Sequence, residues 1–149
     1  MIAIGSDHGG YKLKEEVKKY LGELELPYVD MGTNSEESVD YPDIAKAVSL
    51  KVQSGECDRG VIICRSGYGM AIVANKFKGI RCVPAYVEEA AKFSKLHNDS
   101  NVITLPADYV TVNEAIRILR TWIATEFDGG RHATRVNMIT DIENENMKV

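Results

Sequence analysis

The sequence lacks several features that would assign it to a large class of proteins. It has no apolar run of about 18 residues, the length that a membrane-spanning helix needs. Its net charge of -4 provides no basic surplus that would attract nucleic acid or an anionic membrane. Its amino terminus does not place a basic stretch before an apolar one, so we expect no signal peptide.

Cysteine is also scarce. Cys57, Cys64 and Cys82 lie at unrelated spacings, and no CxxC pair indicates zinc or a redox centre. We therefore expect a reduced, cytoplasmic protein without a metal site. With 149 residues, 44% of them hydrophobic, the chain is long enough for one domain with a substantial core and too short for two. The prediction is a single domain over residues 1–149.

Short apolar stretches alternate with amphipathic ones along the chain. Leu13, Val17 and Leu21 recur at i, i+4 and i+8, which predicts a helix over 11–21. Further helices are expected at about 42–53, 70–76, 87–96 and 110–125, and strands at 2–6, 26–31, 60–64, 80–85 and 102–105. Such alternation indicates an α/β protein: a three-layer α/β/α, open, doubly wound, Rossmann-like sandwich with a five-stranded parallel sheet.

An additional helix is expected after Gly129 and Gly130, at about 134–145, together with the basic pair Arg131 and Arg135. It follows the last element of the predicted core and has little left to pack against. We interpret it as a helix that docks on a partner subunit. The alternative is a frayed surface tail.

Polar residues follow several of the predicted strands. Asp7 and His8 end the first strand, Cys64 ends the third, and His97 with Asn98 leads into the fifth. Because ligands of open α/β sheets bind outside the carboxyl ends of strands, we expect Asp7, Cys64 and His97 to converge on one sheet edge. Each also has a structural interpretation: Asp7 as a helix cap, His97 as a helix C-terminal residue, and Cys64 as a small core residue.

The loop after Cys64 does not match three well-known motifs. A dinucleotide fingerprint starting at Gly67 fails because Ile72 stands where the third glycine is needed. A C-x5-R phosphatase loop fails at Met70. A hydrolase elbow around Ser66 fails because Cys64 stands in place of its first glycine.

The loop still has the composition of an anion-binding nest. Gly67 and Gly69 let the backbone approach a ligand closely, and amides at the start of the next helix point into one space. Such amides would stabilise a phosphate or a developing oxyanion and lower the pKa of the Cys64 thiol, and Arg65 would add to this. Cys64 is therefore a candidate nucleophile or base.

Seven segments together resemble one known family. They are "SDHGGYKLK" at 6–14, "GT" at 32–33, "ESVDYPD" at 37–43, "SGECDRGVIIC" at 54–64, "ANKFKGIRC" at 74–82, "KLHNDSNV" at 95–102 and "FDGGRHATRV" at 127–136. In content and order they resemble the ribose-5-phosphate isomerase B family, which includes the subunits of galactose-6-phosphate isomerase. The resemblance extends over nearly the whole chain.

The resemblance implies an aldose–ketose isomerase that interconverts ribose 5-phosphate and ribulose 5-phosphate through an enediolate, without metal or organic cofactor. It implies that Cys64 moves the proton between C1 and C2 and that His97 opens the furanose ring. Asp7 would orient a sugar hydroxyl. The amides of the segment Ser66, Gly67, Tyr68, Gly69 and Met70 would hold the enediolate, with Ser66 where the family usually has threonine.

The same resemblance implies how the substrate is bound. His8, Arg131 and Arg135 would bind the phosphate, and Tyr41 and Asn98 would line the pocket. The two arginines would reach the active site of the partner subunit, so that a homodimer, or a tetramer built from it, shares its sites. Their i, i+4 spacing on one helix face suits a phosphate clamp.

Two positions depart from the family pattern. Arg65 stands where the family has glycine, and Asp108 stands where it typically has an arginine that binds phosphate. One hypothesis is that Arg65 replaces the missing cation. The others are that the substrate is another sugar phosphate, such as a six-carbon one, or that the chain is a catalytically silent binder of sugar phosphates.

Overall fold

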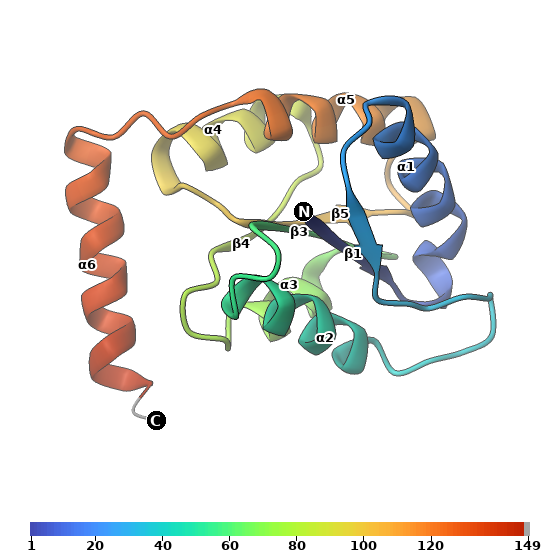
Figure 1. The fold of residues 1–149 in the computed structure, drawn as a ribbon, viewed down its shortest axis with the longest axis horizontal. Helices are drawn as coiled ribbons and strands as arrows, with labels where there is room; N and C mark the ends of the chain where they lie inside the picture. Colours follow the sequence, from blue (N-terminus) through green and yellow to red (C-terminus); the bar gives the residue numbers. More distant parts are fainter. Residues whose placement is uncertain (148–149) are drawn as a thin grey trace.

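The computed structural model describes residues 1–147 and contains a five-stranded parallel sheet with helices on both faces (Figure 1). The strands are β1 (Ile2–Ser6), β2 (Tyr28–Asp30), β3 (Arg59–Cys64), β4 (Cys82–Pro84) and β5 (Val102–Pro106). Their order across the sheet is β2-β1-β3-β5-β4. The predicted α/β sandwich is confirmed.

The helices follow the expected alternation. They are the short 3-10 turn η1 (His8–Gly10), α1 (Tyr11–Glu23), α2 (Tyr41–Gln53), α3 (Tyr68–Ala74), α4 (Glu88–Asn98), α5 (Val112–Ala124) and α6 (Arg131–Asn146). Within residues 1–147, none of them combines the length and the apolarity required to cross a bilayer. Two helices begin earlier than predicted: α3 at Tyr68, because Gly67 caps it with a φ of 83°, and α6 at Arg131.

Side chains of β3 alternate between the two faces of the sheet, as strand geometry requires. Val61 and Ile63 belong to the core beneath α1 and α5, which also buries Leu13, Val17, Leu21 and Trp122. Ile62 and Cys64 belong to the core beneath α2 and α3. This alternation places the Cys64 thiol at the end of β3, on the face covered by α3.

Helix α6 stands apart from the rest of the molecule (Figure 1). Only His132 and Val136 are buried among its residues, whereas Met138, Ile139 and Ile142 are exposed. An apolar groove runs between this helix and β4, and Ile80 and Val83 lie on its other side. That α6 reaches a partner subunit stays a prediction.

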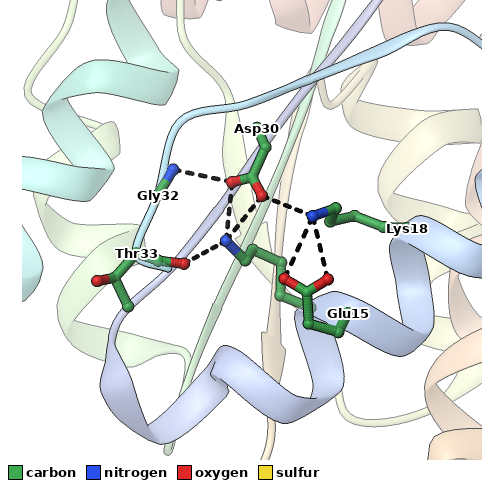
Figure 2. A network of polar contacts seen from close by, with 6 residues as sticks. Glu15, Lys18, Asp30, Gly32 and Thr33 are labelled. Carbon is green, nitrogen blue, oxygen red and sulfur yellow. Dashed lines mark hydrogen bonds and ion pairs between the residues drawn. The ribbon is translucent and has the colours of Figure 1, made fainter. Parts of the chain in front are cut away.

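A network of ion pairs and hydrogen bonds ties α1 to the end of β2 (Figure 2). Lys14 is 0% exposed, and its Nζ lies 2.8 and 3.0 Å from the two carboxylate oxygens of Asp30. It also donates to the carbonyl oxygen of Thr33. Lys18 reaches the same carboxylate at 2.9 Å, and the Gly32 amide donates to it at 2.9 Å. The network thus holds residues 30–33, the start of the loop that leads to α2.

The charges in this network decide the protonation state of Asp30. Burial would raise the pKa of its carboxyl, but the hydrogen bonds from Lys14, Gly32 and Lys18 outweigh burial and hold the pKa below the ordinary 3.8. The carboxylate therefore contributes stability that is complete above about pH 4 and is lost as the pH falls through the lowered pKa.

We predict that Asp30→Asn lowers the free energy of unfolding at pH 7 by about 3 kcal/mol, because it leaves the buried Lys14 ammonium without its counter-charge. Urea unfolding measures this. The matched control is Glu15→Gln, which removes a partly exposed carboxylate from the same network and should cost less than about 1 kcal/mol. The difference from the native chain should shrink below pH 4. Equal losses of unfolding free energy in the two variants would contradict the role of Asp30 as the counter-charge of Lys14.

Candidate active site at the carboxyl edge of the sheet

Strands β1 and β3 are neighbours in the sheet. After β1 the chain adds β2 on one side, and after β3 it adds β4 and β5 on the other side, so the direction in which strands are added reverses between β1 and β3. In open α/β sheets this position forms the ligand-binding crevice. Ser6 pairs with Ile63, so Asp7 and Cys64 follow on adjacent strands. The Asp7 amide donates to the Ile63 carbonyl at 3.2 Å, which fixes the two residues next to each other.

Asp7 acts as a helix cap, as one of its sequence interpretations predicts. Its Oδ1 accepts a hydrogen bond from the Gly10 amide at 3.0 Å, at the start of η1. A Cβ at Gly10 would lie 2.4 Å from the Ile63 carbonyl oxygen, so only glycine lets this turn pack against β3. Capping occupies Oδ1, and Oδ2 is the oxygen with which Asp7 can accept from a ligand hydroxyl.

The Cys64 thiol lies within a ring of backbone amides. The Gly67 amide donates to Sγ at 3.1 Å, and the amides of Ser66 and Met70 also favour the thiolate. Burial nevertheless dominates and, with the negative charge of Asp7, raises the pKa of the Cys64 thiol above its ordinary 9.0. The sequence prediction of a lowered Cys64 pKa is wrong. It considered the effect of the nearby amides but not the desolvation of a thiol that is only 5% exposed.

Two further predicted residues lie at this edge. The Tyr41 ring covers Gly69, since a Cβ there would lie 2.4 Å from the ring's Cε1. His8 accepts a hydrogen bond at Nδ1 from the Val39 amide at 3.2 Å, which ties it to the loop before α2. The structure therefore groups Asp7, His8, Tyr41 and the 64–70 segment.

The two departures from the family pattern contact each other. Arg65 Nη1 lies 3.5 Å from Asp108 Oδ1, with 62% and 46% of the two side chains exposed. The Arg65 stem lies over Gly9, where a Cβ would be 2.6 Å from the arginine Cγ. The pair is therefore exposed at the rim of the site, with the arginine stem over Gly9.

The remaining predicted residues lie elsewhere in this chain. His97 and Asn98 end α4 and precede β5, whose first residue, Val102, pairs with Gly60 at the start of β3. They therefore lie at the amino edge of the sheet, about 13 Å of strand away from Cys64. The prediction that His97 converges with Asp7 and Cys64 within one chain is wrong, because a helix that leads into a strand ends at that strand's amino end.

Arg131 and Arg135 accompany His97 rather than Cys64. His132, between them on α6, stacks on His97 with ring centroids 4.2 Å apart and an interplanar angle of 13°. Burial, followed by the charge of His97, lowers the pKa of His132, which favours a neutral ring in this stack. The exposed arginines thus form a second polar cluster with His97 and Asn98.

Sequence reasoning did not identify two residues that shape these clusters, His132 and Tyr86. His132 lies inside the quoted segment "FDGGRHATRV", and Tyr86 follows the end of β4 at the carboxyl edge. The sequence offered one signal for each of them, namely its position: His132 lies near Arg131 and Arg135, and Tyr86 directly follows the predicted strand at 80–85. In the part of the chain that the structure describes, no group of three or more His, Cys, Asp or Glu side chains is placed to hold a metal ion.

Comparison with known proteins identifies the family and agrees with the fold. The family described as Ribose/Galactose Isomerase matches residues 2–139. Ribose-5-phosphate isomerase B of Escherichia coli is 43% identical over 142 residues, which cover 95% of each chain. The structure of the Clostridium thermocellum ribose-5-phosphate isomerase B has a TM-score of 0.95 at 47% identity, with 97% of each chain covered. That of the Mycoplasma genitalium enzyme, with bound ribulose-5-phosphate, has a TM-score of 0.94 at 35% identity and the same coverage.

Proposed function

Because this chain belongs to the ribose/galactose isomerase family, we propose that it interconverts ribose 5-phosphate and ribulose 5-phosphate. The observation that carries the proposal is the Cys64 thiol at the end of β3, beside Asp7 and hydrogen-bonded by the Gly67 amide. A relative with the same fold has been crystallised with ribulose-5-phosphate, which supports the choice of substrate.

In the proposed reaction, the Cys64 thiolate removes the proton from C2 of the open-chain aldose. The electrons of that C–H bond form the C1–C2 double bond, and the negative charge moves to the oxygen on C1. Amides of the 66–70 segment stabilise this enediolate. A proton then moves from the hydroxyl on C2 to the oxygen on C1, and the Cys64 thiol returns its proton to C1. The C1–C2 double bond is lost, the C2 carbonyl forms, and the product is the ketose. The raised pKa of Cys64 makes its thiolate a stronger base toward carbon, although fewer molecules carry it at neutral pH.

The roles of the other residues are also part of the proposal. His97 opens the furanose ring by moving a proton at the ring oxygen, and Asn98 and Tyr41 line the sugar pocket. Asp7 orients a sugar hydroxyl through Oδ2. His8, Arg131 and Arg135 bind the phosphate, for which guanidinium groups are well suited because they donate two parallel hydrogen bonds.

These roles require two copies of the chain. Cys64 and His97 lie at opposite edges of one sheet, so one active site would combine the Cys64 edge of one subunit with the His97 cluster of another. The exposed apolar side chains of α6, Met138, Ile139 and Ile142, support burial of this helix in an interface. We propose a homodimer with shared sites.

A second candidate function rests on Arg65 and Asp108. The Arg65 stem lies over Gly9, which follows the proposed phosphate ligand His8 in the chain, so the ion pair can change which sugar phosphate fits. The alternative is the same enediolate chemistry on another sugar phosphate, such as a six-carbon one. A catalytically silent binder is the less favoured form, because a pure binder does not need the Cys64 thiol.

We predict that the protein converts ribose 5-phosphate into ribulose 5-phosphate and that Cys64→Ala lowers kcat about a thousand-fold. Proton NMR in deuterium oxide measures both the conversion and solvent deuterium at the exchanged carbon. Cys57→Ala is the control, because Cys57 is a buried thiol that precedes the amino end of β3, whereas Cys64 ends the strand, so this variant should retain activity. Turnover of a six-carbon sugar phosphate alone would favour the second candidate, and binding without any turnover would favour the silent form.

The shared site predicts complementation between inactive variants. When Cys64→Ala and His97→Ala chains are unfolded together and refolded, half of the dimers are mixed, and each mixed dimer regains one intact site. Activity should recover to roughly a quarter of that of the native protein. A mixture of Cys64→Ala with Asp7→Asn is the control and should stay inactive, because both residues belong to the same edge. Failure of the first mixture to recover would exclude sharing.

We predict that Arg65→Gly lowers kcat/KM for ribose 5-phosphate about tenfold, or about 1.4 kcal/mol, because Asp108 then faces the phosphate dianion without its partner. Adding Asp108→Arg should restore most of the loss. Steady-state kinetics measures this, with ribose as a substrate that lacks the phosphate and should respond little. Compensation by Arg65 is wrong if the double variant loses as much as Arg65→Gly alone.

A further inference from the structure

Two side-chain hydroxyls hold the backbone of the loop after Cys64. Tyr86 Oη donates to the Ser66 carbonyl oxygen at 2.5 Å. Thr104 Oγ1, from β5, donates to the Gly67 carbonyl oxygen at 2.8 Å. A Cβ at Gly67 would lie 2.9 Å from the same Thr104 oxygen, so this anchor requires glycine. Two consecutive peptide groups are thus each held by a side-chain hydroxyl.

The anchor on Ser66 controls the amide that faces the thiol. In a trans peptide the C=O and N–H groups point in opposite directions. When Tyr86 holds the Ser66 carbonyl, the Gly67 N–H of the same peptide must point away from Tyr86. That N–H donates to Cys64 Sγ at 3.1 Å. One peptide group therefore links the phenol to the thiol, and hydrogen bonds in such a chain strengthen one another.

Tyr86 is itself held in place. Its ring lies between those of Tyr68 and Tyr109, with centroid distances of 5.6 and 5.7 Å. Burial, and then the neighbouring Tyr68, raises the pKa of Tyr86 to about 12. The phenol therefore keeps its proton, and so stays a donor, at neutral and moderately alkaline pH.

We propose that Tyr86 is a positioning residue: its hydroxyl holds the Ser66–Gly67 peptide so that the Gly67 N–H stabilises the Cys64 thiolate. The consequence for catalysis rests on the proposed isomerase function, whereas the consequence for the thiol does not. The other titratable groups that act on Cys64 are Asp7, which follows β1, and Cys82 from β4. Burial raises the pKa of Cys82, so it stays neutral, and Asp7 is the charge whose effect the peptide opposes.

The test is the pH dependence of Cys64 alkylation by iodoacetamide, followed on the Cys64 peptide by mass spectrometry so that Cys57 and Cys82 do not contribute. In Tyr86→Phe we expect the midpoint to rise by about half a unit to one unit, because the Gly67 amide is no longer held. Tyr109→Phe is the matched control: it removes a phenol from the same aromatic group, on an exposed side chain, and should leave the midpoint unchanged.

A second variant keeps the shape of the site and should shift the midpoint of Cys64 alkylation in the opposite direction. Replacing Tyr86 by 3-fluorotyrosine supplies a more acidic phenol and a stronger donor, so the midpoint should fall below that of the native protein. A purely structural role of Tyr86 would not produce opposite shifts. In steady-state assays we expect Tyr86→Phe to lower kcat about three- to tenfold at pH 7 with KM nearly constant.

These readouts separate the two proposals. Opposite shifts of the alkylation midpoint support the positioning role even if the native protein converts no sugar phosphate, in which case the proposed function fails alone. Unchanged midpoints in both Tyr86 variants overturn the positioning role, whether or not ribose 5-phosphate is isomerised. Equal midpoint shifts in Tyr86→Phe and Tyr109→Phe also overturn it, because they would indicate a general effect on the aromatic group.

Discussion

The hydrogen bond from the Gly67 amide to Cys64 Sγ is the interaction on which the candidate site depends. It requires that β3 end at Cys64, that Gly67 adopt a φ of 83°, and that α3 begin directly afterwards. A side chain at Gly67 would meet Thr104, so the turn cannot be built with another residue without displacing β5. The amides of the loop reach the thiol only because these conditions hold together.

Competing electrostatic effects have opposite outcomes at the two buried polar centres. At Asp30, hydrogen bonds from two lysines and an amide outweigh burial, and the carboxylate stays charged. At Cys64, three amides do not outweigh burial and the charge of Asp7, and the thiol stays mostly protonated. The difference follows from the partners, since full positive charges stabilise an anion more than amide dipoles do. The first arrangement serves stability, and the second leaves a thiol whose anion is the strong base that the proposed reaction requires.

The division of polar residues between two sheet edges has a topological cause. In a parallel sheet every strand presents its carboxyl end at one edge, whereas the helices that return the chain end at the other. Asp7 and Cys64 follow strands and meet. His97 and Asn98 end a returning helix, and α6 carries Arg131 and Arg135 beside them. A site that uses both groups has to be assembled from two subunits, which is the basis of the proposed dimer.

The sequence by itself determined the α/β class, most element positions and the pairing of Asp7 with Cys64, because apolar periodicity and strand-end position are local properties of the chain. It also carried the motifs by which the family is identified. Only the tertiary structure decided that β5 lies between β3 and β4 in the sheet, that His97 is remote from Cys64, and that Tyr86 holds the Ser66 carbonyl. It also decided the direction of the Cys64 pKa shift. These properties depend on burial and on contacts between residues distant in sequence, which no local pattern encodes.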